Sequence, residues 1–332
     1  MPAVERLEVS ARAVGERLDR YLAREFPSIS RSRLAELIQQ GSVRVSGARA
    51  KPSHRVARGE VVEVAILPRE PLRAEPVAVP LQILHEDADV VVVNKPAGMV
   101  VHPGAGTHPG AATLAGALLH RYGGLSSEGG AVRPGIVHRL DRGTSGAMVV
   151  ARNDAAHRAL AEQFAGRTVE KVYIALVHGR WNETEGSIQL PVARDLHRRT
   201  RMTTRRGPNE SRASRTDWRT LAVLGPYTLV EARLCTGRTH QIRVHFSAIG
   251  HPVLGDSLYG APKAPEADGK LLPVLGRVFL HAGRLAFSHP RTGKRIVARA
   301  PLPRELREFL AVLGEAVGTP AARVDAALQG YL

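Results

Sequence analysis

The hydrophobic pattern of the first part of the chain predicts a small unit of helices and strands. Before residue 41, apolar residues recur twice at intervals of three and four, as one face of a helix requires. These residues are Leu18, Tyr21 and Leu22, and then Leu34, Leu37 and Ile38. Ser30 suits the N-cap of the second helix, and Gly41 suits its C-terminal end. Two valine-rich runs, 43–45 and 61–66, predict short strands after it.

A proline-rich stretch then interrupts the pattern and predicts a stiff, extended linker. Its prolines are Pro68, Pro71, Pro76 and Pro80. We therefore expect five parts: an N-terminal arm (1–14), the small unit (15–67), the linker (68–80), one large domain (81–313) and a C-terminal tail (314–332). The alanine-rich tail predicts a loose or partly disordered helix.

The large domain mixes short apolar runs with stretches of helical spacing. The runs that predict strands are Val90–Val93, Ala147–Ala151, Val169–Val177, Thr216–Val223 and Thr228–Leu234. Helices are predicted over 113–122, 154–164 and 239–249, and an irregular insertion over 261–277. This pattern predicts an α+β fold.

The charge balance changes this picture by indicating a polyanionic partner. Lysine and arginine number 47 against 31 acidic residues, which favours nucleic acid. A genome that favours arginine and alanine is the alternative explanation. The stretch 198–212 concentrates Arg198, Arg199, Arg201, Arg205, Arg206 and Arg212. We expect it to contact RNA, since these charges repel one another without an anion; a merely solvated loop is the alternative.

Other classes of protein are disfavoured. Apolar runs such as Val90–Val93 are far shorter than the roughly 20 residues that cross a bilayer. Nothing at the N-terminus resembles a signal peptide. Cys235 is the one cysteine, so no internal disulfide can form, and a cytoplasmic location is expected.

The segment 135–147 carries the candidate chemistry. A short apolar run ends in a polar cluster around Asp141, and Gly143 and Gly146 let the backbone turn before a second apolar run. Catalytic side chains are often presented at such a junction. A structural aspartate that holds the loop is the alternative interpretation of Asp141.

Several motifs of the chain resemble, in the same order, those of the RluA-type RNA pseudouridine synthases. They are Asn94–Gly98, Val101–Gly104, His138–Asp141 with Thr144–Gly146, Lys171–Ala175, Gly237–His245 and His251–Gly260. The small unit resembles an S4 RNA-binding module through Arg17–Asp19, Ser30–Ser32 and Gly41–Gly47. Together the two parts are similar to the type D branch, which modifies large-subunit (23S) ribosomal RNA. The resemblance implies a mixed, mainly antiparallel sheet with flanking helices and an active site in a basic cleft.

The resemblance also implies roles for individual residues. Asp141 matches the catalytic nucleophile, Arg238 the arginine that pairs with it, and Tyr173 the tyrosine placed against the target base. Arg139 matches the residue that fills the space left when the nucleotide flips out of its stack. A carboxylate suits nucleophilic attack and proton removal, provided that a nearby cation keeps it ionised. Whether it attacks the ribose or the base stays open, as do the uridines that are modified.

Further residues are expected to contact the RNA. Those near the active site are His138, Thr144, His240, Gln241 and Arg243, with a structural role as the alternative for His138. Those on the S4-like unit are Arg31, Arg33, Arg44 and Lys51, because guanidinium and ammonium groups suit phosphate.

Rival sites fit the sequence less well. His240 and His245 are five residues apart, not the four of a zinc-binding helix, so no metal is expected. The run 143–147 departs from the Gly-x-Ser-x-Gly pattern of a serine hydrolase, and no nucleotide-binding loop occurs. We expect a monomeric enzyme without a cofactor, acting on large-subunit ribosomal RNA or pre-ribosomal particles. The alternative is a noncatalytic RNA-binding or ribosome-assembly protein.

Overall fold

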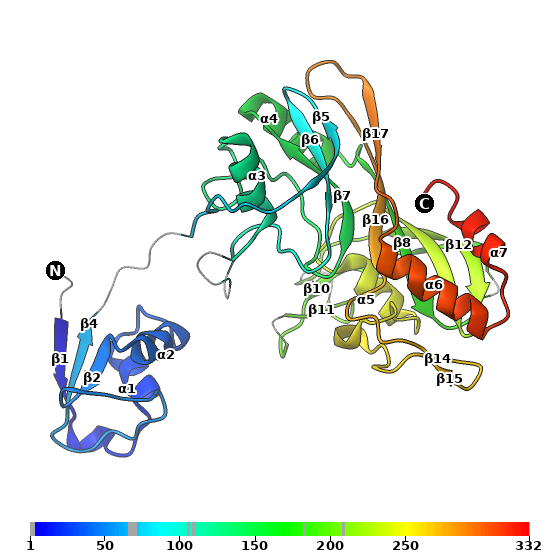
Figure 1. Cartoon of the computed structure of the whole chain (residues 1–332). Coiled ribbons are helices and arrows are strands. Elements are labelled where there is room, and N and C mark those ends of the chain that lie inside the picture. Colours follow the sequence, from blue (N-terminus) through cyan, green and yellow to red (C-terminus); the bar gives the residue numbers. More distant parts are fainter. Residues whose placement is uncertain are drawn as a thin grey trace. The chain divides into compact units, whose positions relative to one another are not determined.

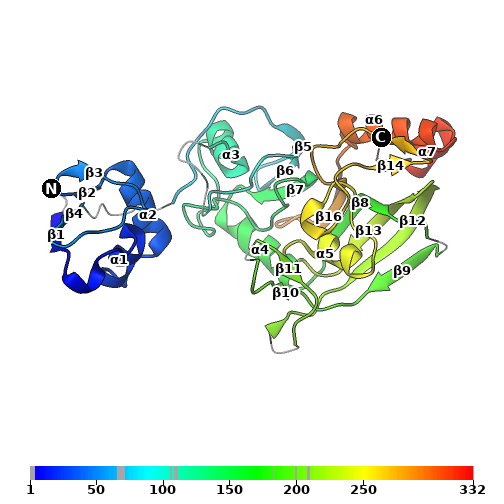
Figure 2. The same cartoon turned by 90° about the horizontal axis from the view of Figure 1, so that it is seen from below.

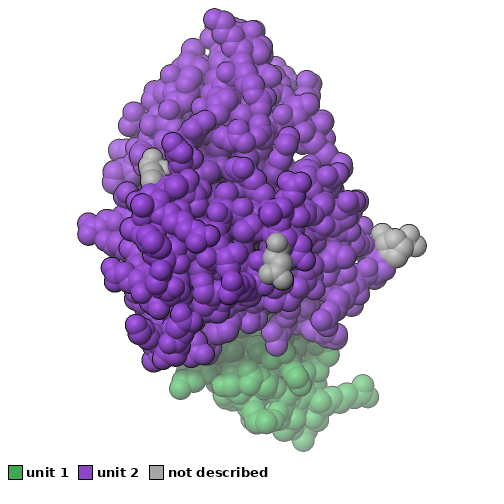
Figure 3. All heavy atoms as spheres, turned by 90° about the vertical axis from the view of Figure 1, so that its right-hand side faces the viewer, with its two compact units in different colours: residues 1–71 green, residues 72–332 purple. Residues whose placement is uncertain are grey.

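The computed structural model describes residues 4–65, 72–104, 107, 111–181, 183–198, 200–207 and 210–331. Within it the chain forms two compact units, residues 1–71 and 72–332 (Figure 3). Five earlier predictions fall partly outside the described residues: residues 1–3 of the arm, the end of the strand at Ile66, the linker residues 68–71, Arg199 in the basic stretch and Leu332 of the tail.

The small unit packs two helices against one antiparallel sheet in the order β1-β4-β2-β3. Its elements are β1 (Val4–Glu8), the short helix η1 (Ala11–Ala13), α1 (Leu18–Glu25), α2 (Arg31–Gln40), β2 (Val43–Val45), β3 (Ala48–Arg49) and β4 (Val61–Ala65). The predicted caps of α2 are confirmed: Ser30 accepts the Arg33 N–H, and Gly41 is left-handed with φ of 82°. Residues 4–8, expected in an extended arm, instead pair with β4 as strand β1, because Leu7 packs on the core of this unit.

The large unit is built on a nine-stranded sheet in the order β5-β6-β7-β16-β8-β13-β12-β9, with β17 paired to β16 (Figure 1). Its strands are β5 (Gln82–Glu86), β6 (Val90–Lys95), β7 (Ser145–Ala151), β8 (Glu170–His178), β9 (Glu185–Ile188), β12 (Thr216–Leu224), β13 (Tyr227–Leu234), β16 (Leu280–Ser288) and β17 (Arg295–Arg299). The β7–β16 pair is parallel and the other pairs are antiparallel. The expected α+β class with a mixed, mainly antiparallel sheet is therefore confirmed.

Helices cover both faces of this sheet: Figure 2 shows α6 and α7 on one side, and α5 with the β10–β11 hairpin on the other. The helices are α3 (Leu114–Tyr122), α4 (Asp154–Ala165), α5 (Gln241–Ala248), η3 (Ser257–Tyr259), α6 (Arg304–Ala316) and α7 (Ala321–Ala327). Two small hairpins complete the unit, β10 (Ala193–Arg194) with β11 (Met202–Thr203) and β14 (Glu266–Ala267) with β15 (Lys270–Leu271). Among the described residues, no helix has the length and apolar character needed to cross a membrane.

Strand β8 shows how the sheet separates its two cores. Successive side chains of a strand point to opposite faces. Tyr173 and Ala175 therefore join the core that holds Ile242 and Phe246 of α5. Ile174 and its even-numbered neighbours join the core formed with α6 and α7. This alternation places Tyr173 on the α5 face, which is also the face of the candidate site.

Two expectations of irregular structure are corrected. The tail is not loose, because Val324, Leu328 and Tyr331 are buried against the sheet, and Tyr331 donates to Glu231 at 2.7 Å. Within 261–277, the β14–β15 hairpin buries Ala267 in the same core. Both segments look irregular in sequence because proline and glycine interrupt them, as at Gly318 and Pro320 in the tail and at Pro265, Gly269 and Pro273 in 261–277.

Candidate active site

The loop that carries Asp141 leads directly into β7. In the short apolar run before this loop, Ile136 makes a single bridge to Val150. The Thr144 N–H donates to the Asp141 carbonyl at 3.0 Å and closes the turn. Gly146 allows close approach rather than a tight turn: it has φ of 123°, and a Cβ atom there would lie 2.3 Å from the Ala282 carbonyl oxygen on β16.

A cavity of about 530 Å³ opens beside this loop. Residues from the loop, the end of α4, strand β8 and the segment 234–243 line it. Its cationic lining residues are Arg133, Arg139, Arg167, Lys171, Arg238 and Arg243. Asp141 is the one carboxylate among the described residues that line it. The cavity therefore suits an anionic ligand and presents a single carboxylate to it.

Arg243, in the first turn of α5, links Asp141 to a second carboxylate. Its Nη1 lies 3.2 Å from Asp141 Oδ2, while Nε and Nη2 donate to both oxygens of Asp256 at 2.6 and 2.8 Å. Burial opposes the charge of Arg243, but the hydrogen bonds and charges of Asp256 and Asp141 outweigh it and raise its pKa. The guanidinium is therefore permanently charged and held in a fixed orientation.

This arrangement corrects the pairing expected for Arg238. No ion pair joins Arg238 to Asp141 among the described residues; Arg243 makes that contact instead. Arg238 lies in the loop before α5, and its guanidinium donates to the Ala213 carbonyl at 3.4 Å. It does line the cavity, and its pKa is lowered by burial and then by the charges of Arg212 and Arg167. A cation in such surroundings is suited to meeting an anion from the ligand.

Tyr173 faces the same cavity from β8 and is 7% exposed. Burial, followed by the negative charge of Asp141, raises the pKa of its phenol. The hydroxyl therefore stays protonated at physiological pH, and the ring presents a neutral aromatic surface close to the carboxylate.

His240 approaches Asp141 from the start of α5. Its Nε2 lies 3.8 Å from Asp141 Oδ2, and its Nδ1 lies 2.9 Å from the hydroxyl of Tyr259. That hydroxyl also accepts the Met202 N–H at 2.8 Å. Burial lowers the pKa of His240 and the charge of Asp141 opposes this shift. The structure thus brings together three of the expected site residues, Asp141, His240 and Arg243.

Gln241, expected to face the substrate, has no polar group left for it. Its Oε1 accepts from Thr236 Oγ1 and the Arg238 N–H, at 2.7 and 3.0 Å. Its Nε2 donates to the Arg215 carbonyl and Thr216 Oγ1, at 2.9 and 3.0 Å. These four bonds use the full capacity of the amide. Gln241 therefore holds the loop before α5 in place, which corrects the substrate contact predicted for it.

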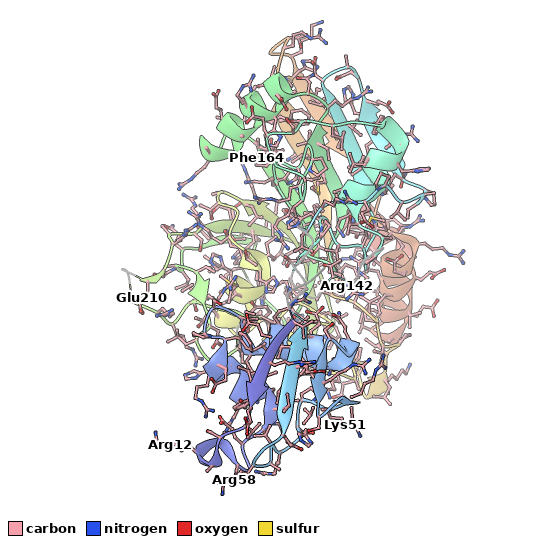
Figure 4. All side chains as sticks on the ribbon, turned by 90° about the vertical axis from the view of Figure 1, so that its left-hand side faces the viewer. Arg12, Lys51, Arg58, Arg142, Phe164 and Glu210 are labelled. Atoms are coloured by element: carbon pink, nitrogen blue, oxygen red, sulfur yellow. The ribbon has the colours of Figure 1, made fainter. Side chains whose placement is uncertain are left out.

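His138 also has a structural arrangement. Its Nε2 accepts the Val149 N–H of β7 at 3.0 Å, and its ring stacks on Phe164 with 4.5 Å between the centroids; Figure 4 labels Phe164 at the end of α4. Burial, and then the charge of Lys171, lowers its pKa to about 3. The neutral imidazole fastens the loop of Asp141 to β7 and also lines the cavity, so both interpretations of this residue stay open.

Arg139 and Thr144 differ in how far their side chains are exposed to solvent. Arg139 is exposed at the cavity, with Nη1 3.5 Å from His102 Nε2. Thr144 is only 2% exposed, and its buried hydroxyl has no hydrogen-bond partner among the described residues. Their predicted contacts with RNA stay predictions.

Lys95 belongs to a motif noted in the sequence but was given no role. It is fully buried and donates to the carbonyls of Pro96, Met99 and Arg142 at 2.8, 2.9 and 3.5 Å. Burial, and then the charge of Arg277, lowers its pKa to about 7. It ties the turn after β6 to the residue that follows Asp141. The signal for it was a lysine at the end of a strand that begins with four valines.

One cluster of described residues, Asp87, Asp89 and His289, has the spacing of a metal site. His289 Nδ1 accepts the N–H groups of Arg291 and Thr292, both at 3.1 Å. The proton of the neutral ring is therefore on Nε2, which lies 3.1 Å from Asp87 Oδ2. A metal ion at Nε2 would have to displace this proton, and Arg291 already lies 2.6 Å from Asp89. The cluster fits an ion-pair network rather than a metal centre.

The basic residues of the small unit differ in what they contact. Arg31 and Arg17 both bind the buried carboxylate of Asp19, at 2.7 and 3.0 Å, so the group keeps one net positive charge. Arg33 pairs with Glu36 at 2.9 Å. Arg44 donates to the Gly47 carbonyl, and Lys51 projects outward as Figure 4 shows. Neither Arg44 nor Lys51 has an ion pair among the described residues, so both cations are available to phosphate.

Comparisons with known proteins define the class to which this fold and site belong. The model of the family described as RNA pseudouridylate synthase matches residues 89–248, and that of the S4 domain matches residues 16–62. The human RNA pseudouridylate synthase domain containing 1 superposes with a TM-score of 0.52 at 30% identity, over 70% of this chain and 86% of its own.

Curated relatives cover nearly the whole chain. A protein of Aquifex aeolicus, named an uncharacterized RNA pseudouridine synthase, is 42% identical over 319 residues, 95% of this chain and 99% of its own length. The ribosomal large subunit pseudouridine synthase D of Zymomonas mobilis is 43% identical over 314 residues, 93% of this chain and 97% of its own. The chain belongs to the RluA-type RNA pseudouridine synthases, isomerases that act on RNA, and carries an N-terminal S4 domain.

Proposed function

We propose that this protein isomerises specific uridines of large-subunit ribosomal RNA to pseudouridine, with Asp141 as the nucleophile. The observation that carries the proposal is the single carboxylate of a cation-lined cavity, held by Arg243 beside Tyr173. The substrate follows from the similarity to the large-subunit synthase D of Zymomonas mobilis. An S4 domain in the same chain supports binding to a structured RNA.

The chemistry needs a nucleophile and a proton acceptor but no cofactor. The C1′–N1 bond of the uridine breaks, the uracil turns, and a C1′–C5 bond forms. The proton on C5 is lost and N1 gains one, so that the atoms balance. Arg243 donates a hydrogen bond to Oδ2 of Asp141 and orients the carboxylate. No hydrogen bond from the described residues reaches Oδ1, which is therefore free to attack the ribose or the base.

Two further side chains suit the bound nucleotide. The neutral ring of Tyr173 offers a stacking surface for uracil beside Asp141. The exposed guanidinium of Arg139 at the cavity is suited to filling the gap that the flipped nucleotide leaves in its stack.

A map of pseudouridine in large-subunit RNA tests the proposal. It compares cells with the gene intact, deleted, or changed to Asp141→Asn. We expect specific sites to disappear in both altered strains and to return with the intact gene. An unchanged map would sink the ribosomal assignment, and the substrate would be another RNA. If purified protein also failed to modify any RNA while still binding it, the chain would be a noncatalytic RNA-binding protein.

A further inference from the structure

A second cavity, of about 460 Å³, adjoins the one that holds Asp141. The two share Arg167, Leu234 and Thr236 as lining residues, so Arg167 stands at their junction. The second cavity is lined by the segment after α4 and by the end of β13, all within the large unit.

Arginine dominates the lining of this second cavity. Its arginines are Arg167, Arg215, Arg233 and Arg295. Arg215 is neutralised by Asp217 at 2.8 Å, and Arg295 by Glu170 at 2.7 Å. Arg167 and Arg233 are exposed and form no ion pair with any carboxylate of the described residues. These two guanidinium groups are therefore available to bind a ligand from outside the chain.

Two more cations without carboxylate partners lie on the active-site side of the junction. They are Lys171, 8% exposed on β8, and Arg238, and neither is in an ion pair with a described residue. Burial, and then the charges of neighbouring arginines, lowers the pKa of Arg238. Burial likewise leads the causes that lower the pKa of Lys171, and the charge of Arg167 adds to it. An anion between these groups would relieve a repulsion that the protein itself leaves uncompensated.

We propose that Arg167 and Arg233, together with Lys171 and Arg238, form a track that binds the phosphodiester backbone of the RNA beside the target uridine. The inference deepens the proposed function, on which it rests. Guanidinium forks match the geometry of phosphate oxygens, and phosphate contacts fix the register of a nucleic acid without reading its bases. An RNA backbone bound along this track runs from the second cavity to the first and passes Arg167 between them. Only the flipped nucleotide then reaches Asp141.

The test compares the double variant Arg167→Gln, Arg233→Gln with the matched control Arg307→Gln, Arg323→Gln. The control removes the same charge from exposed positions on α6 and α7, on the other side of the sheet. Binding of the full chain to single-stranded oligouridylate is followed over a range of salt concentrations. We expect the double variant to bind about tenfold more weakly. The slope of the logarithm of its binding constant against the logarithm of the salt concentration should become shallower by about 0.7 per lost phosphate contact.

A second probe separates phosphate binding from base stacking. With an oligouridylate whose linkages are uncharged methylphosphonates, the double variant and the wild type should bind equally. The proposal would be wrong if the double variant kept the affinity and salt dependence of the wild type. It would also be wrong if the control pair lost as much affinity as the double variant.

The proposed function fails by a different result, an unchanged pseudouridine map for Asp141→Asn. A double variant that lost affinity in that case would still establish the track as an RNA-binding site.

Discussion

Two carboxylates contact the same guanidinium of Arg243, and their surroundings differ. Asp256 is 1% exposed and uses both oxygens on Arg243, at 2.6 and 2.8 Å. The Asp141 side chain is 19% exposed and makes one contact of 3.2 Å. Asp256 therefore holds the arginine, whereas Asp141 is held by it and keeps Oδ1 without a hydrogen bond from the described residues. The difference shows how a carboxylate can be fixed in position while one oxygen stays available to a ligand.

The largest expected effect is a difference in stability between the two aspartates. Asp256→Asn removes one of the two carboxylates that compensate the buried charge of Arg243. It should lower the free energy of unfolding by about 3 to 5 kcal/mol. Asp141→Asn should change it by less than about 1 kcal/mol, because Asp256 still compensates Arg243. Urea unfolding followed by tryptophan fluorescence measures this, since both tryptophans, Trp181 and Trp218, belong to the large unit.

The same experiment contains its own control. Trp181 and Trp218 pack edge to face at 4.2 Å, so their emission reports the unit that holds the site and not the S4 domain. Equal losses of stability in the two variants would contradict the comparison. They would mean that Asp141 is as much a part of the framework as Asp256.

A smaller effect distinguishes Arg238, which the sequence analysis expected to pair with Asp141, from Arg243, which it expected to contact RNA. Arg243→Lys loses the fork that spans Asp256 and Asp141 and should lower kcat by about a hundredfold. Arg238→Lys keeps a cation where no carboxylate is bound, and should mainly raise KM for RNA. Steady-state pseudouridine formation on large-subunit RNA separates the two parameters. The reverse pattern would restore Arg238 as the partner of Asp141 in the reacting enzyme.

The partner of Asp141 shows what the sequence can and cannot predict. Arg238 was expected in this place, and the structure has Arg243 there. The caps of α2 and the strand of Tyr173 depend on residues within a few positions of each other, and both were predicted. The ion pair between Arg243 and Asp141 joins residues 102 positions apart, so no local pattern encodes it. Gln241 is similar, because its four hydrogen bonds depend on how β12 and the segment before α5 meet.

Strand β16 was missed for a related reason. It mixes Leu280 and Phe287 with His281 and Arg284, so it shows no clean alternation. His281 is nevertheless fully buried, because the carbonyl of Ala300 and the hydroxyl of Ser145 meet its two ring nitrogens. The polar residue that hid the strand is thus the one that ties β16 to β7. Satisfied polar groups in the framework are harder to predict from sequence than the unsatisfied ones of the site.

The last prediction concerns His138, which the framework uses through Nε2, the acceptor of the Val149 N–H. Its pKa of about 3 is below the roughly 6.5 of an unfolded histidine. The unfolded chain therefore binds a proton first, and stability falls below about pH 6.5 by up to about 1.4 kcal/mol per pH unit from this group. His138→Gln keeps an acceptor for the Val149 N–H without titrating, so its unfolding free energy should fall less steeply between about pH 6 and about pH 4. His120→Gln, an exposed change on α3, should follow the wild type, and a His138→Gln curve parallel to both would show that the imidazole is not held neutral.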